Sequence, residues 1–273
     1  MRIMCIHAHC DDFEFVAAGT FELMRRKHAP DFRAKVVVCT DGRAGHHART
    51  RAETAAIRLE EQKSSARIGG YEFELLTRPD GKPFADAHLA GNDMQASLWK
   101  VIRDFEPDYL FSPPLPVDTI CGVHPDHIAV ADGIRRVAYM INVPHAFLDE
   151  YPVADERKSR WIKTPVILTA FDLYMGATRK PDVVINVEPV FDSIVRQSWC
   201  HQSQITEWLP WIGRHGVDVP ADMAAWERNL RERNLSHRRK AGLGDGPAVE
   251  TFHISGWGMA PEPGALERDF PSL

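Results

Sequence analysis

Two clusters of histidine and aspartate stand out in the sequence, and both carry side chains that bind divalent metals. The first is Ala8-His9-Cys10-Asp11-Asp12 and the second is His124-Pro125-Asp126-His127. Each cluster follows a short apolar run, Ile3 to Ile6 and Tyr109 to Phe111. A catalytic zinc ion takes three protein ligands and leaves its fourth position for water or substrate. We therefore predict that the two clusters are the two halves of one metal site.

The predicted metal ligands are His9, Asp12 and His127, which supply two imidazoles and one carboxylate. A short spacing within the first pair and a distant third ligand is typical of a catalytic rather than a structural site. A bound zinc ion lowers the pKa of its water from ~15.7 towards ~7, so that hydroxide is available near neutral pH. Asp11, between two of the ligands, is then the candidate general base for that water.

The second cluster also offers groups that would act on the reacting bond. His124 lies three residues before His127 and would share one side of a first helical turn with it. As an imidazolium it would stabilise the oxyanion of a tetrahedral intermediate and protonate a leaving amine. Asp126 would orient the His124 ring, as carboxylates beside metal sites often do. Taken singly, His9 would be a hydrogen-bonded core histidine and Asp11-Asp12 a helix cap; the pairing of both clusters favours the metal site.

The elements that must position these residues follow from the apolar pattern. Strands are predicted over residues 2–8, 35–40, 71–76, 108–112, 166–171, 183–187 and 248–253, and helices over 17–27, 51–68, 93–105, 124–140, 190–204 and 221–239. Near-continuous apolar strands that alternate with helices indicate an α/β, Rossmann-like fold, with a mostly parallel sheet and helices on both faces. In the common doubly wound order the first and fourth strands are neighbours, and ligands bind beyond their carboxyl ends.

We predict one domain over residues 1–273, with a core of about residues 1–142 and a C-terminal elaboration of about residues 143–273. Trp199, Trp208, Trp211 and Trp226 lie in the elaboration. Tryptophans at helical spacing are more often packing or subunit-contact residues than sugar-stacking platforms. They make a homo-oligomer a reasonable expectation. His46 and His47, in a polar loop, are interpreted as solvated or substrate-edge groups rather than as ligands.

Composition excludes several classes of protein. The formal charge of −5 comes without an extended basic run, so nucleic acid is not a favoured partner. No apolar segment approaches the ~20 residues that a membrane-spanning helix needs. The N-terminus enters a strand directly, unlike a signal peptide. The five cysteines are scattered and form no CxxC pair, which predicts no disulfide framework and a reducing, cytoplasmic location.

With these motifs in place, the chain resembles the LmbE/PIG-L family of zinc-dependent N-acetylglucosaminyl deacetylases. That family carries Ala-His-Pro-Asp-Asp near its N-terminus and His-Pro-Asp-His in its middle, and residues 8–12 and 124–127 are similar. Weaker similarities are, in chain order, Gly19-Thr20, Thr40-Asp41-Gly42, Arg58-x-x-Glu61, Ile68-Gly69, His201-Gln202-Ser203-Gln204 and Glu250-x-Phe252. The resemblance spans most of the chain.

The resemblance implies zinc on His9, Asp12 and His127, Asp11 as base and His124 as oxyanion stabiliser. It also implies that Arg58 contacts the substrate, although an ion pair between Arg58 and Glu61 within one helix would explain Arg58 as well. The expected reaction is removal of an acyl group, N-acetyl above all, from an amino sugar or its conjugate. Departures from the family pattern are Cys10 in place of proline, Phe13 in place of an acidic residue, and Val16, Ala17 and Ala18 in place of a glycine-rich turn. They leave the ligands and the base intact, and they fall where they would alter the shape of the pocket.

Other functions use the same residue types. Two histidines and a carboxylate also bind Fe²⁺ in non-haem oxygenases. Fe²⁺ is therefore the alternative metal for this site. Those enzymes usually have a β-barrel, and Asp11 would have no task in them. A metal-dependent amidase for a non-sugar amide and a non-catalytic carbohydrate-binding protein are the remaining alternatives. Dinucleotide binding is disfavoured because no GxGxxG follows the first strand.

Overall fold

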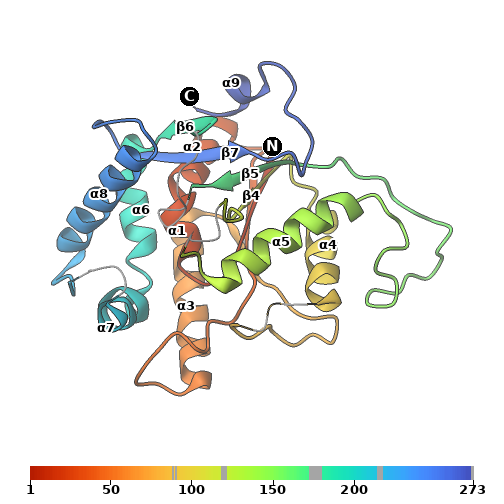
Figure 1. The fold of residues 1–273 in the computed structure, drawn as a ribbon, viewed down its shortest axis with the longest axis horizontal. Coiled ribbons are helices and arrows are strands. Elements are labelled where there is room, and N and C mark those ends of the chain that lie inside the picture. The colour runs from red at the N-terminus through yellow and green to blue at the C-terminus, as the bar shows by residue number, and fades with distance from the viewer. Residues whose placement is uncertain (88, 90, 118–121, 172–179, 214–217, 272–273) are drawn as a thin grey trace.

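The computed structural model of the chain describes residues 1–87, 89, 91–117, 122–171, 180–213 and 218–271. A seven-stranded sheet crosses it in the order β3-β2-β1-β4-β5-β7-β6 (Figure 1). The strands are β1 Arg2–His7, β2 Arg33–Val38, β3 Glu72–Leu75, β4 Tyr109–Ser112, β5 Val166–Ala170, β6 Val183–Asn186 and β7 Val249–Ile254. β7 runs antiparallel to β5 and β6, and every other pair is parallel. The predicted mostly parallel α/β fold is confirmed.

Helices cover both faces of this sheet. They are α1 Asp12–Val16, α2 Ala18–His28, α3 Arg51–Gly69, α4 Asn92–Phe105, α5 Pro125–Met140, α6 Phe191–Ser198, α7 Leu209–Ile212, α8 Met223–Lys240 and α9 Ala265–Asp269, with a 3₁₀ turn at Glu188–Val190 and a π-helix at Ser203–Trp208. In Figure 1, α4 and α5 lie on one side of the strands, and α1, α2, α6 and α8 lie on the other. Ile3 and Cys5 of β1 are buried towards the second group, whereas Met4 and Ile6 are buried towards the first. Burial on both faces explains why the strand has no polar alternation.

The central strands β1 and β4 are neighbours, as predicted. Their register pairs Ile3 with Tyr109 and Cys5 with Phe111. Because the pairing is parallel, the segments that follow β1 and β4 emerge at the same edge of the sheet. That edge therefore receives both histidine–aspartate clusters.

The chain between residues 188 and 212 differs from the single helix that we predicted. Helix α6 ends at Ser198, and turn hydrogen bonds from Cys200 N to Gln197 O (3.1 Å) and from His201 N to Ser198 O (3.0 Å) follow it. The helical course resumes as the π-helix and then α7. This interruption places His201 in the interior, fully buried. The helix predicted over residues 17–27 is α2, and the short helix α1, which was not predicted, precedes it and ends before Ala17.

A carboxylate from the last strand supports the start of α2. Glu250 of β7 accepts the backbone N–H groups of Gly19 (2.8 Å) and Thr20 (2.7 Å). The first N–H groups of a helix have no partner within the helix and carry partial positive charge, so a carboxylate there stabilises the helix. Gly19 also packs tightly, since an added Cβ would lie 2.7 Å from Val187. The Gly19-Thr20 and Glu250 motifs are thus two sides of one contact.

No helix among the described residues combines the length and apolar character that a membrane span requires. The described cysteines, Cys5, Cys10, Cys39 and Cys200, are free, and Cys121 lies outside the described residues.

Candidate metal centre and active site

The three predicted metal ligands lie together where β1 and β4 end. Asp12 is the first residue of α1, and His127 is in the first turn of α5. Asp12 Oδ2 lies 3.3 Å from His9 Nδ1 and 3.2 Å from His127 Nε2. The rings of His9 and His127 have their centroids 5.3 Å apart. Side chains more than 110 positions apart in the sequence therefore form one cluster.

Two further histidines enlarge this cluster. Nitrogen atoms of His9, His124 and His127 lie within 4.8 Å of one another, and so do the donor atoms of His7, Asp12 and His127. His7, the last residue of β1, was not predicted as a site residue. A signal was available, because His7 stands only two positions before His9, at the end of the strand that leads into the first cluster. The apolar run that precedes His7 made it read as part of a buried strand.

The donor set fits a divalent metal. Two imidazoles and one carboxylate are a frequent catalytic zinc set, and Zn–N and Zn–O bonds of about 2.0–2.1 Å in a tetrahedron separate neighbouring donors by about 3.3–3.4 Å. The two distances measured from Asp12 Oδ2, 3.3 and 3.2 Å, agree with that spacing. His9, Asp12 and His127 are nevertheless not among the sets of described residues whose donor atoms all lie within 4.8 Å of one another, so the two imidazoles are farther apart than in a closed tetrahedron. Fe²⁺ accepts the same donor types.

The electrostatics of the cluster keep Asp12 ionised. Burial alone would raise the pKa of Asp12, but His127 and His7 hold that pKa well below its usual range. Burial would lower the pKa of His9, yet hydrogen bonds to Asp12 and Asp126 raise it to about 10. The carboxylates around His9 therefore favour positive charge at this position, as a metal-binding site requires.

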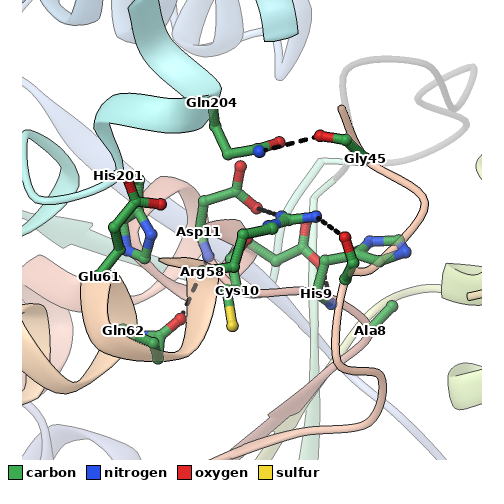
Figure 2. Close-up of polar contacts among 12 residues, drawn as sticks. Ala8, His9, Cys10, Asp11, Gly45, Arg58, Glu61, Gln62, His201 and Gln204 are labelled. Carbon is green, nitrogen blue, oxygen red and sulfur yellow. Dashed lines mark hydrogen bonds and ion pairs between the residues drawn. The ribbon is translucent and has the colours of Figure 1, made fainter. Parts of the chain in front are cut away.

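Asp11 lies beside the cluster in a strained backbone conformation. Its φ is +92° and its ψ is −29°, a region that favours glycine. Two residues of α3 hold it there: Arg58 Nη2 donates to Cys10 O (2.5 Å) and to Asp11 Oδ1 (3.2 Å), and Asp11 N donates to Gln62 Oε1 (3.2 Å) (Figure 2). Burial raises the pKa of Asp11 to about 6, against the opposing charge of Arg58. Asp11 is then largely ionised at pH 7 and close to the pKa that suits a general base.

A buried polar network stands behind Asp11. Gln62 Nε2 donates to Glu14 Oε1 (2.9 Å), and Glu14 Oε2 pairs with His201 Nε2 at 3.3 Å. Burial opposes charge on both partners, but the pair lowers the pKa of Glu14 and raises the pKa of His201. Figure 2 shows His201 facing the Asp11 segment from the C-terminal part of the chain. In the family pattern an acidic residue stands at the position of Phe13. In this chain a buried carboxylate lies one position later, at Glu14.

Arg58 is buried and does not pair with Glu61. The Arg58 side chain is 5% exposed and its guanidinium faces Asp11. Glu61 instead accepts hydrogen bonds from Ser203 N and Ser203 Oγ, both at 2.7 Å. The alternative of an ion pair within one helix is therefore wrong. With so little exposure, Arg58 is better suited to holding Asp11 than to the substrate contact implied by the resemblance.

His124 is the half-exposed member of the cluster. It is the N-cap residue of α5, and its Nδ1 accepts the N–H of Asp126 at 3.2 Å. Burial, His9 and His127 lower the pKa of His124 to about 4. A neutral ring whose Nδ1 accepts carries its proton on Nε2. His124 therefore offers an Nε2–H donor at neutral pH, not the imidazolium that we expected.

Asp126 lies closer to His9 than to His124. Its Oδ2 is 3.0 Å from His9 Nε2 and 3.9 Å from His124 Nδ1, and both oxygens accept the N–H of Ala87 at 3.0 Å. A carboxylate on the second nitrogen of a metal-binding histidine fixes the orientation of that ring. The geometry therefore links Asp126 to His9, whereas the sequence had suggested His124.

The loop after β2 joins the π-helix beside the site. Gln204 Nε2 donates to Gly45 O at 3.2 Å (Figure 2), and His46 Nε2 lies 2.9 Å from Glu207 Oε2. His47 stacks on Trp211, with centroids 4.7 Å apart and an angle of 2° between the rings. Trp226, by contrast, is buried and donates to Ser198 Oγ at 2.9 Å.

The sequence matches the PIG-L family, described as GlcNAc-PI de-N-acetylase, over residues 4–138. Through those residues, the chain belongs to the PIG-L family. The PIG-L match contains all seven predicted site residues and ends within α5. His201 and Glu250 lie beyond it. Among curated proteins, none matches the chain.

Several solved structures share the fold of this PIG-L protein. An N,N'-diacetylchitobiose deacetylase from Pyrococcus horikoshii is 22% identical, with a TM-score of 0.66 over 94% of this chain and 84% of the other. GalB, the 4-carboxy-2-hydroxymuconate hydratase from Pseudomonas putida KT2440, is 17% identical, with a TM-score of 0.64 over 96% and 97%. The A40926 pseudoaglycone deacetylase Dbv21 is 16% identical, with a TM-score of 0.57 over 93% and 96%.

Proposed function

We propose that this protein is a metal-dependent N-deacetylase that acts on an amino sugar or an amino-sugar conjugate. The observation that carries the proposal is the convergence of His9, Asp12 and His127 beside a buried, ionisable Asp11. The PIG-L match over residues 4–138 supports an amide substrate, and deacetylases occur among the structures of similar fold. A zinc ion on the three ligands, with Fe²⁺ as the alternative, is part of the proposal.

Each group has a defined task in this reaction. When bound, the metal would polarise the amide carbonyl and lower the pKa of a water molecule. Asp11 takes a proton from the attacking water and delivers it to the leaving nitrogen, which conserves protons over the cycle. Arg58 keeps Asp11 in position through Asp11 Oδ1 and Cys10 O. His124 donates its Nε2–H to the oxygen that gains negative charge as the carbonyl is attacked. Asp126 orients His9.

The test combines metal analysis with an activity assay. Bound metal would be quantified in the purified protein, and amine release would be followed with N-acetylglucosamine and a panel of its conjugates. Asp11→Asn should keep the metal and lower the rate by about 10²–10⁴-fold, since it removes the base and leaves the three predicted ligands in place. Asp192→Asn, at an exposed residue of α6, is the matched control and should keep both metal and rate.

Three outcomes would overturn parts of this proposal. A protein that takes up no divalent metal when zinc or iron is supplied would refute the metal site. A metal-loaded protein that releases no amine from any sugar amide would refute the substrate class and favour a non-sugar amide. An Asp11→Asn variant of unchanged rate would remove Asp11 from the reaction.

A second candidate is the addition of water to a conjugated double bond. The fold of a hydratase, GalB, matches 96% of this chain with a TM-score of 0.64, close to the value for the chitobiose deacetylase. A base beside a metal site can serve either reaction, because both begin with attack by water. Loss of the absorbance of 4-carboxy-2-hydroxymuconate, without amine release from sugar amides, would favour the hydratase.

We also propose that the whole chain acts as one domain. β5 of the C-terminal portion pairs directly with β4 of the core, and β7 continues the same sheet. Homo-oligomerisation stays a prediction.

A further inference from the structure

His7 makes the shortest side-chain contact of the metal cluster. Its Nδ1 lies 2.7 Å from Asp12 Oδ2, within hydrogen-bond distance, and the Asp12 oxygen also accepts the backbone N–H of His9 at 2.7 Å. The edge of the His7 ring meets the ring of His127, with centroids 4.6 Å apart and an angle of 87°. His7 thus touches two of the three proposed ligands.

The direction of the His7 hydrogen bond follows from the chemistry of the partners. An ionised carboxylate can only accept, so Nδ1 must carry the proton that it donates to Asp12. Ala8 N also lies within 3.1 Å of this nitrogen, but it is a donor and lies farther away. His7 is therefore protonated on Nδ1, and its contact with Asp12 is a charge-assisted hydrogen bond of the stronger kind.

The backbone holds His7 rigidly. Residue 7 pairs with Val38 in the parallel ladder of β1 and β2, and its carbonyl accepts Cys39 N–H at 2.9 Å. The His7 residue is 4% exposed. A donor on a strand inside the sheet can fix a carboxylate more accurately than a donor on a loop. Without it, Asp12 Oδ2 would keep the His9 N–H and lose the other strong donor.

We propose that His7 is a positioning residue of the metal centre, which fixes the Asp12 carboxylate for binding a divalent cation through its Nδ1–H. This inference rests on the metal site of the proposed function, but not on the identity of the substrate. Groups that orient a ligand typically change metal affinity by about 10–100-fold when they are removed.

Two variants of nearly equal shape isolate the hydrogen bond. In His7→Asn the side-chain amide places an N–H close to the position of Nδ1, whereas His7→Leu has similar volume and no donor. Zinc affinity would be measured by competition with a chromophoric chelator, and the visible spectrum of the cobalt-substituted protein would report ligand geometry. Thermal unfolding of the metal-free proteins would show that each variant folds.

We expect His7→Leu to bind zinc about 10–100-fold more weakly and to alter the cobalt spectrum, with His7→Asn close to wild type. Equal zinc affinity in His7→Leu and wild type would refute the role of His7. Equal losses in both variants would also refute it, because packing or direct coordination would then explain the effect. A wild-type protein without metal affinity would refute the proposed metal site itself, and a metal-binding protein without deacetylase activity would leave the His7 result valid.

Discussion

The buried His237 should make the stability of the protein fall between pH 7 and pH 5. His237 of α8 is 8% exposed, lies 2.8 Å from Thr251 Oγ1 and packs on the ring of Phe171. Burial, with the charges of Arg233 and Lys240, lowers the pKa of His237 from 6.5 to about 3. Between these two values the unfolded chain binds a proton that the folded chain does not, so stability falls as pH falls.

The size of the effect follows from the two pKa values. At pH 5 the unfolded histidine, with a pKa of ~6.5, is almost fully protonated and the folded one is neutral. Each pH unit below the unfolded pKa lowers the free energy of unfolding by ~1.36 kcal/mol. From pH 6.5 to pH 5 this amounts to about 2 kcal/mol, so His237 accounts for a loss of about 2 kcal/mol between pH 7 and pH 5. Urea unfolding of wild type and His237→Gln at both pH values measures this loss, because other titrating groups are common to both proteins.

His237→Gln keeps an amide that can bond Thr251 and removes the titration. We expect the variant to lose about 2 kcal/mol less than wild type over this pH range. His145→Gln, at an exposed histidine, is the matched control and should show the wild-type loss. Equal pH dependence in His237→Gln and wild type would refute this reasoning.

Three further predictions concern the site and its supports. Arg58→Met leaves Asp11 buried without its cation, so the free energy of unfolding in urea should drop by ~3–5 kcal/mol and the reaction rate by about 10²-fold. Arg196→Met, on the surface, is the control and should change neither quantity. Glu250→Gln puts an amide N–H towards Gly19 and Thr20, so we expect the free energy of unfolding to fall by about 1–3 kcal/mol. Glu232→Gln, at an exposed residue of α8, is the control and should cause no loss, and an unchanged urea midpoint in Glu250→Gln would contradict the capping role. A chelator should lower Tm, because zinc at 100 times its Kd stabilises the folded state by ~2.7 kcal/mol; a Tm indifferent to the chelator would contradict metal binding to the folded protein.

The sequence was most informative where pattern and topology reinforce each other. Near-continuous apolar strands such as β1 predicted a parallel sheet that is buried on both faces. The doubly wound strand order then predicted that His9 and His127 lie at one edge of that sheet. The ion-pair partner of Arg58 could not be predicted from the sequence. Glu61 is one helical turn away and looks like the natural partner, but the fold brings Asp11 to Arg58 and Ser203 to Glu61.

Two other features depended on tertiary structure that no local pattern encodes. The periodicity of residues 190–204 continues smoothly, so it gave no sign that the chain would leave α6 at Ser198 and bury His201. Asp126 stands two positions from His124, and sequence proximity suggested that pair. In the structure Asp126 is closer to His9, because the segment after β1, which carries His9, lies against the start of α5, which carries Asp126.

The backbone of Asp11 carries a consequence for how such a protein changes under selection. A residue with φ of +92° is strained unless it is glycine, and a carboxylate buried there needs Arg58 to remain charged. Replacing Asp11 by glycine alone would relieve the backbone strain but leave Arg58 buried without its anion. Only a paired change, Asp11 to glycine and Arg58 to an apolar residue, would relieve both costs, and it would abolish the proposed base. Such paired variants should gain stability and be inactive, and descendants freed from catalysis would drift towards them. Activity and stability therefore compete at this pair of residues.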